Sequence, residues 1–222
     1  MRKTVQIPKI IEKELPNLHL TKASAARMEL FLQLLHRWNA KINLTAIRSK
    51  EQQFAKHILD SLAIGKCPTL WETLSGKLLD MGSGAGLPGI PLSIAKPELE
   101  VFSIDKSQRK ITFQQHVRAQ LQLGRFHPVA GRLQFAAQSA IHKNRYDVVV
   151  SRALDKLTAM FRLGNAFLKD DGKLIVWKGR RWREEYRDVP SDLKGQYRMV
   201  EKCRYRFEDY GGGGTILCFA GD

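Results

Sequence analysis

The residues best suited to chemistry lie in a glycine-rich segment, residues 79–89, which reads Leu-Asp-Met-Gly-Ser-Gly-Ala-Gly-Leu-Pro-Gly. The apolar residues at its start predict a strand over 77–81, and those after it predict a helix near 88–96. Glycine lets the backbone turn sharply and approach a ligand without a clash from a Cβ atom. A turn at the carboxyl end of a strand is where open α/β sheets bind nucleosides. The segment therefore predicts a nucleoside-binding loop.

Three interpretations of this loop compete. The glycines from Gly84 to Gly89 have the G-x-G-x-x-G spacing of a dinucleotide-binding loop of dehydrogenases, which is a weak signal alone. An acidic residue followed by three alternate glycines, beginning at Asp80, is instead typical of S-adenosylmethionine (AdoMet) methyltransferases, whose loop holds a cationic ligand without phosphates. A purely structural turn is the third. In either enzyme Asp105, at the end of the next predicted strand, would accept ribose hydroxyls.

Alternating strands and helices must position this loop. The sequence predicts strands over 77–81, 100–105, 126–130, 146–150 and 172–178, with helices near 88–96, 106–122, 132–142 and 155–168. Such alternation indicates a parallel sheet with helices on both faces. Strands near 196–207 and 214–220 flank four glycines, which we expect to form a flexible turn of an antiparallel hairpin. A C-terminal hairpin is typical of methyltransferase sheets and unusual in dinucleotide-binding domains, so it favours the methyltransferase.

The first 75 residues predict a helical segment. Thr21 can cap a helix whose apolar stripe runs from Met28 to Trp38, and residues 49–52 have the form of a capping box that opens a second helix. We therefore expect an α/β fold in two parts. An N-terminal helical segment (1–75) precedes a Rossmann-like methyltransferase domain (76–222).

Composition and charge limit the class of protein. A chain of 222 residues, 43% of them hydrophobic, suits one medium-sized domain with an extension. No apolar run approaches the roughly 18 residues of a membrane span, and the first residues lack a secretory signal. Lys and Arg number 37 against 22 Asp and Glu, and residues 106–146 hold eight basic residues and no acidic one. A basic surface attracts polyanions, so a nucleic acid is the first partner to consider.

The three cysteines, Cys67, Cys203 and Cys218, show no Cys-x-x-Cys or Cys/His spacing. This pattern argues against a zinc site and against a disulfide scaffold. We therefore expect no metal, and a location in the reducing cytoplasm.

Several stretches together resemble the glucose-inhibited division protein B family, the small-subunit ribosomal RNA methyltransferase G enzymes. The matching stretches lie at 34–39, 42–48, 57–63, 80–91, 105–113, 151–153 and 177–179. The most specific feature is the pairing of Asn-Leu-Thr (43–45) and His-Ile-Leu-Asp-Ser-Leu (57–62) with the glycine segment. The resemblance implies an AdoMet-dependent enzyme, which we expect to be a monomer, that methylates guanine N7 at one site of 16S rRNA in the small ribosomal subunit.

The resemblance also implies a set of binding residues. Those for the cofactor are Gly82, Gly84, Leu87, Asp105, Leu133, Gln134 and Arg152, and those for the substrate are Arg132 and Lys178. Gln134 departs from the family, which usually has a carboxylate there, but its amide oxygen can still accept a hydrogen bond from the adenine amino group. For residues 181–210 we can claim no match to the family. The basic and aromatic residues near 180–187 allow either an RNA contact or an ordinary helix with ion pairs.

No catalytic acid or base is expected, because guanine N7 carries a lone pair and no proton near neutral pH. Catalysis would come mainly from holding N7 in line with the methyl–sulfur bond. We expect His57 to be a surface or capping residue, and an ion pair of Arg152 with Asp147 or Asp155 is an alternative to a binding role. Two other functions stay open: methylation of another RNA such as tRNA, and RNA binding without catalysis.

Overall fold

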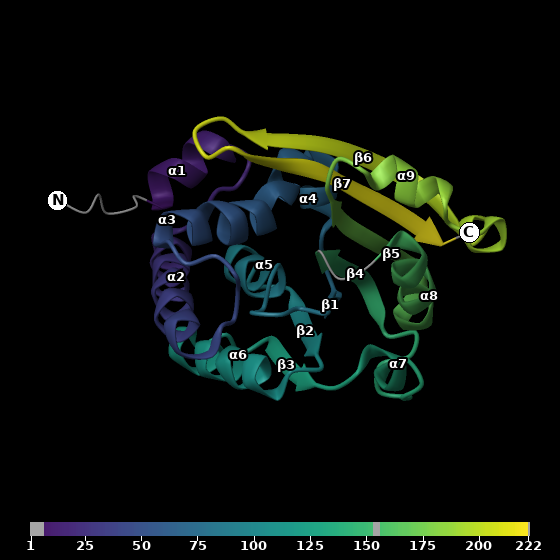
Figure 1. Cartoon of the computed structure of the whole chain (residues 1–222), viewed down its shortest axis with the longest axis horizontal. Coiled ribbons are helices and arrows are strands. Elements are labelled where there is room, and N and C mark those ends of the chain that lie inside the picture. Colours follow the sequence, from purple (N-terminus) through teal and green to yellow (C-terminus); the bar gives the residue numbers. More distant parts are fainter. Residues whose placement is uncertain (1–6, 153–155, 222) are drawn as a thin grey trace.

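The computed structural model describes residues 7–152 and 156–221, in which a seven-stranded sheet is covered by helices (Figure 1). The strands are β1 (Lys77–Met81), β2 (Glu100–Asp105), β3 (Phe126–Ala130), β4 (Tyr146–Arg152), β5 (Leu168–Lys178), β6 (Tyr197–Phe207) and β7 (Gly212–Gly221). Their order across the sheet is β3-β2-β1-β4-β5-β7-β6. The first five strands are parallel, and β7 pairs antiparallel with both β5 and β6. This is the predicted Rossmann-like sheet with a C-terminal hairpin.

The helices divide between the two faces of the sheet. They are α1 (Ile7–Glu14), α2 (Lys22–Ile42), α3 (Lys50–Gln53), the π-helical η1 (Phe54–Leu59), the 3-10 helix η2 (Leu62–Lys66), α4 (Pro68–Thr73), α5 (Gly89–Ala95), α6 (Gln108–Leu121), α7 (Leu133–Ala136), α8 (Leu157–Phe167), α9 (Trp182–Arg187) and α10 (Ser191–Lys194). Buried side chains of α1 to α6 pack against one face, and those of α7 to α10 against the other. Successive strand residues alternate between the faces: Val148 and Val150 join the first cluster, and Val149 the second.

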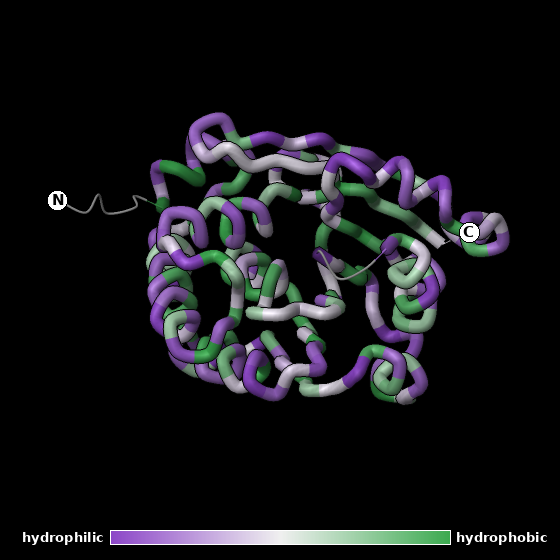
Figure 2. The backbone as a smooth tube through the Cα atoms, in the orientation of Figure 1, coloured by the Kyte–Doolittle hydropathy of each residue, from purple (hydrophilic) through white to green (hydrophobic). Residues whose placement is uncertain are grey.

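Hydropathy follows this layering. The central strands are hydrophobic over most of their length, whereas the outer helices mix hydrophobic and hydrophilic residues (Figure 2). The helical segment contributes to the same hydrophobic cluster as the sheet, since residues such as Phe31 and Leu62 belong to one cluster with Val101 and Ile216. Within the described residues, no helix is both long and apolar enough to cross a membrane.

Local sequence signals were reliable predictors of element ends. The Thr21 side chain accepts a hydrogen bond from Ser24 N (3.1 Å), and the Ser49 side chain accepts one from Gln52 N (3.1 Å), so both predicted caps are confirmed. Strands over 77–81, 100–105 and 126–130 have the predicted ends, whereas β4 and β5 are longer than predicted.

Two local predictions were wrong. Only Leu133–Ala136 of the helix expected near 132–142 is helical, because its apolar residues Phe135 and Ile141 lie exposed and bury no stripe that would stabilise a longer helix. Of the four glycines only Gly211 lies in the hairpin turn, with a φ angle of 60°, and the other three belong to β7, which begins at Gly212. A Cβ atom on Gly214 would lie 2.9 Å from the Lys178 carbonyl oxygen, so this position needs glycine for close strand packing.

The structure also corrects the expectation for the cysteines, which therefore give no support for a reducing compartment. Cys67, at the end of η2, forms a disulfide with Cys203 of β6, and the two Cα atoms are 5.9 Å apart. Spacing could not indicate this pair, because 136 residues separate the partners and only the return of β6 brings them together. Cys218 is a free, buried thiol, and burial raises its pKa to about 12.

We expect reduction of this disulfide to lower the free energy of unfolding by about 2–4 kcal/mol, because the reduced chain gains loop entropy when it unfolds. Denaturant unfolding with and without a reductant measures the effect. A Cys67→Ser/Cys203→Ser variant should not respond to the reductant. Thiol titration of the denatured, unreduced protein should find only Cys218, and three reactive thiols would contradict the assignment.

Candidate functional site

The glycine loop lies at the edge of the sheet where the five parallel strands end. Gly82, Gly84 and Gly86 have φ angles of 67°, 58° and 80°, which only glycine adopts readily. The loop is fastened to the end of β2, because Gly82 N and Ser83 N both donate to the Ile104 carbonyl at 3.0 and 3.1 Å. A Cβ atom on Gly84 would meet only Lys110 Nζ, at 3.9 Å, so the loop leaves open space on this side. Leu87 is buried in the turn that follows.

Asp105 closes β2 beside this loop. One carboxylate oxygen accepts from Gly84 N (2.9 Å) and the other from Ser107 N (2.8 Å). Each oxygen keeps a second lone pair, so the carboxylate can still accept ribose hydroxyls. Gly131 N donates to the Asp105 carbonyl (3.0 Å) and so ties the end of β3 to the same place.

Residues 132–134 continue from that attachment into α7. Leu133 is buried, whereas Arg132 and Gln134 are exposed to solvent. The structure thus brings all three next to the predicted ribose acceptor at the carboxyl edge of the sheet.

Gln114 is a residue of this site that the sequence reasoning missed. It is fully buried on α6; its side-chain nitrogen donates to Ser83 Oγ and to Gly84 O, both at 2.9 Å, and its oxygen accepts from Ser103 Oγ at 2.6 Å. The side chain therefore holds the glycine loop against β2. A glutamine within the buried stripe of a helix was the only signal in the sequence.

Asp80 is a buried acid directly behind the loop. Its Oδ2 accepts from Gly89 N (2.8 Å), and its Oδ1 has no hydrogen-bond partner among the described residues. Burial raises its pKa from 3.8 to about 7, against the opposing effects of the Gly89 hydrogen bond and the Arg152 charge. A nearby positive charge would stabilise the ionised form of this buried carboxyl group. Together with the open loop, it fits a cationic nucleoside ligand such as AdoMet.

Arg152, at the end of β4, turns toward the helical segment. Its NH1 group donates to Asp60 Oδ2 (2.9 Å) and to the Lys56 carbonyl (2.8 Å), and its NH2 group lies 3.4 Å from His57 Nδ1. The alternative pairing with Asp147 is wrong, because Asp147 pairs with Lys169 (2.6 Å). Asp155 lies outside the described residues.

Asp60 joins three strands to the helical segment. Besides Arg152 of β4, it accepts a hydrogen bond from the Tyr205 hydroxyl of β6 through its side chain and one from Trp177 Nε1 of β5 (2.9 Å) through its carbonyl. Burial and the neighbouring Asp60 charge raise the pKa of Tyr205, which stays a neutral donor. We call Asp60, Arg152, Tyr205, Trp177 and His57 the Asp60 cluster.

His57 is not the surface or capping residue that the sequence suggested, since it is only 9% exposed. Burial first, and then the Arg152 charge, lower its pKa to about 4, so the ring is neutral at pH 7. A neutral ring can accept from Arg152 at Nδ1 and donate from Nε2 to Thr45 Oγ1, 2.8 Å away. The 43–45 and 57–62 stretches thus meet Arg152 at the edge that carries the glycine loop.

Lys178 ends β5 at the same edge and is 8% exposed. Its Nζ lies 2.7 Å from Glu185 Oε2 of α9. Residues 182–187 form a helix, with the Arg183 guanidinium 4.9 Å from the centre of the Trp182 ring. The stretch is therefore helical, but its Glu185 pairs with Lys178 of β5 rather than with a residue of the same helix, and an RNA contact stays a prediction.

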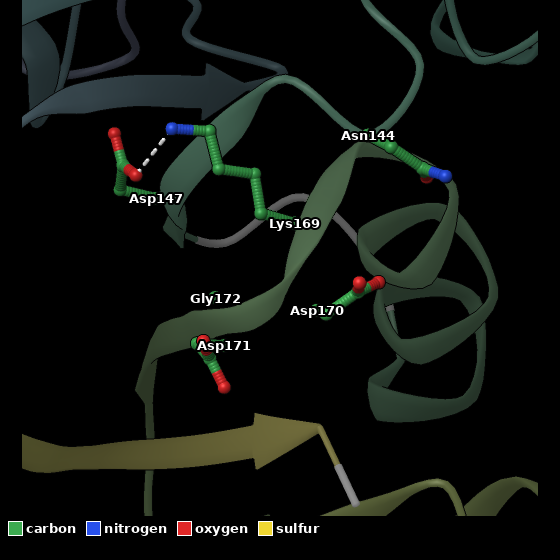
Figure 3. A pocket seen from close by; sticks show the side chains of 6 residues that line it. All are labelled: Asn144, Asp147, Lys169, Asp170, Asp171 and Gly172. Atoms are coloured by element: carbon green, nitrogen blue, oxygen red, sulfur yellow. Dashed lines mark hydrogen bonds and ion pairs between the residues drawn. The ribbon is translucent and has the colours of Figure 1, made fainter.

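A hollow at the opposite edge of the sheet does not belong to this site. It is lined by Asn144, Asp147, Lys169, Asp170, Asp171 and Gly172 (Figure 3). These residues surround the start of β5, whereas the glycine loop follows the carboxyl end of β1. Over residues 7–152 and 156–221, no three His, Cys, Asp or Glu side chains are grouped to hold a metal ion.

Comparisons with known proteins agree with this geometry. Residues 24–206 match the family described as GidB, rRNA small subunit methyltransferase G, so the match includes residues 181–206, for which the sequence analysis claimed none. Ribosomal RNA small subunit methyltransferase G of Syntrophotalea carbinolica is 44% identical over 179 residues, which cover 80% of this chain and 79% of that protein.

Solved structures share the fold at low sequence identity. P. horikoshii TYW2 in complex with MeSAdo is 11% identical with a TM-score of 0.54, and the match covers 74% of this chain but only 62% of that one. M. jannaschii TYW2 in complex with AdoMet is 16% identical with a TM-score of 0.50, covering 72% and 74%. Both similarities concern the fold alone.

We expect the affinity for AdoMet to rise as the pH rises from about 6 to about 8, because Asp80 ionises through pH 7 and its anion attracts the cation. About nine-tenths of this carboxyl is protonated one pH unit below its pKa, so the gain is at most about tenfold. Isothermal titration at several pH values measures it. For the stability of the protein without ligand, the pH dependence has the opposite sign. The pKa of Asp80 in the folded protein exceeds its usual value of 3.8, so the free energy of unfolding falls as the pH rises from about 4 to about 7.

Asp80→Asn is the control for this prediction. It should bind AdoMet more weakly and lose the pH dependence between about pH 6 and 8. A wild-type affinity that does not change with pH, or an equal pH dependence in the variant, would show that Asp80 does not face the cofactor's charge.

Proposed function

The chain belongs to the rRNA small subunit methyltransferase G family and is an AdoMet-dependent rRNA methyltransferase, and from that premise we propose that it methylates guanine N7 at one position of 16S rRNA. The observation that carries the proposal is the convergence of the glycine loop, Asp105 and the Asp60 cluster on one sheet edge. A ribosomal substrate supports a cytoplasmic location, and we propose that the chain acts there as a monomer.

The proposed cofactor residues have complementary tasks. The loop glycines Gly82 and Gly84 give the ligand room, Leu87 adds apolar contact, and Asp105 accepts the ribose hydroxyls. Leu133 and Gln134 would flank the adenine. When bound, AdoMet supplies a methyl group made electrophilic by its sulfonium. Asp80 favours the positive charge of that ligand from behind the loop.

Arg152 would bind cofactor or substrate while Asp60 holds it in place. Two of its five N–H groups serve Lys56 and Asp60 and a third faces His57, whereas the other two have no partner among the described residues. These free donors can take the cofactor's carboxylate, a phosphate or the guanine O6. Arg132 and Lys178 would contact the RNA.

Methyl transfer to guanine N7 requires that the two reactants be held in position, and it requires no proton transfer. Guanine N7 needs no base, and the neutral His57 is fully engaged by Thr45 and Arg152. Holding N7 in line with the methyl–sulfur bond can contribute about 7–11 kcal/mol by removing the entropy cost of alignment. The chain's residues therefore act by binding and orienting.

Mapping 7-methylguanosine in total RNA from cells with and without the gene tests the function. We expect one 16S position to lose the modification and to regain it with the wild-type chain. A Gly84→Val variant, whose side chain would fill the open side of the loop, should not restore it. Loss in tRNA instead would give another substrate, and no loss anywhere would leave a non-catalytic RNA-binding protein.

We expect Arg152→Lys to lower the methylation rate at least about tenfold, or about 1.4 kcal/mol of barrier, because lysine keeps the charge but loses the planar fork. Thermal stability should change little, since lysine can still pair with Asp60. Arg162→Lys on the exposed side of α8 is the matched control and should methylate normally. An Arg152→Lys chain with a normal rate, or one that unfolds, would give Arg152 a purely structural role.

A further inference from the structure

We propose that the α7 surface, made of Arg132, Phe135 and Ile141, docks the RNA substrate, with the Phe135 ring stacking on an unpaired base beside the target guanosine. This inference rests on the proposed function and adds to it the place where the RNA lies. Its first support is the exposure of two large apolar side chains.

Phe135 and Ile141 are 69% and 75% exposed, and the only other large hydrophobic exposed in the described part of the chain is Val200, at 38%. Single exposed apolar residues are ordinary. Here two lie six positions apart in one short segment, on and just after a helix of one turn whose Leu133 is buried. Covering a phenylalanine side chain is worth about 1.5–3 kcal/mol, so a partner gains by binding here.

The charge around these side chains selects the partner. Arg132 reaches solvent in the same segment, which lies within the 41 residues from Lys106 to Tyr146 that carry no acidic group. A second copy of this chain would bring a net charge of +15 against the same surface and be repelled. A polyanion is attracted instead, through release of its counterions.

The position of the α7 surface fits a base next to the target. Gly131 N is bonded to the Asp105 carbonyl, and Phe135 follows four residues later, within one helical turn of Leu133. The proposal therefore places along this segment the RNA strand that brings a guanine to the cofactor. Single-stranded RNA is recognised largely by stacking unpaired bases on aromatic rings, each worth about 1–3 kcal/mol.

The test measures binding of in vitro transcribed 16S rRNA by fluorescence anisotropy. Phe135→Leu keeps an apolar side chain but removes the ring, and we expect affinity to fall about tenfold, within the range for one stacked base. Phe135→Trp keeps a ring and should bind within about twofold of wild type. Val200→Ala on β6 is the matched control, an exposed apolar residue whose loss should change nothing.

Salt separates stacking from charge. The Phe135→Leu variant should keep the wild-type slope of log affinity against log salt, whereas Arg132→Gln should reduce that slope by about one. AdoMet affinity should be unchanged in every variant. The inference is overturned if Phe135→Leu binds rRNA like wild type, if it unfolds, or if wild type sediments as a dimer that this substitution dissociates.

Failure of this inference is distinguishable from failure of the proposed function. A wild-type chain that methylates 16S rRNA beside a Phe135→Leu chain of equal affinity overturns the docking surface only. A wild-type chain that leaves 16S rRNA unmethylated overturns the function itself.

Discussion

The geometry of the site depends on the Asp60–Arg152 ion pair. Asp60 comes from the helical segment and receives hydrogen bonds from β4, β5 and β6 at the edge where the parallel strands end. The side chains of Asp60 and Arg152 are 23% and 13% exposed, so water screens their attraction less than that of a surface pair. Breaking a pair of this kind leaves a charge without its partner in a poorly hydrated place, which is costly. The helical segment is thus part of the site.

A second constraint acts at the glycine loop. The polar groups of the loop that face β2 have hydrogen-bond partners within the protein, whereas one oxygen of Asp80, behind the loop, has none among the described residues. Gln114 and the Ile104 carbonyl occupy the groups of the loop that face β2. Behind the loop, Asp80 has one oxygen with no donor among the described residues. Because buried polar atoms are nearly always paired, such an atom in an otherwise satisfied site points to a ligand or to protonation. The pKa of about 7 makes both states accessible near neutral pH.

Sequence patterns correctly predicted the features that depend on interactions between residues close together in the chain. The caps at Thr21 and Ser49, the first three strands and the glycine loop depend on residues within a few positions of each other, and they lie where the sequence indicated. The Arg152–Asp60 contact and the disulfide join residues 92 and 136 positions apart, so only the topology of the sheet creates them. The nearer acid, Asp147, failed as a partner because it lies toward the other end of β4, about 16 Å away along the extended strand.

The region where local prediction failed most is also informative. A surface helix usually buries an apolar stripe against the core, and a helix near 132–142 was expected to do so. Instead the chain forms a single helical turn, and Phe135 and Ile141 are exposed to solvent. The end of β2 and the neighbouring β3 follow the predicted boundaries, so this exception lies in the segment that follows β3. Departures of this kind concentrate at functional sites, where a sequence gives up some folding stability to present side chains to a partner.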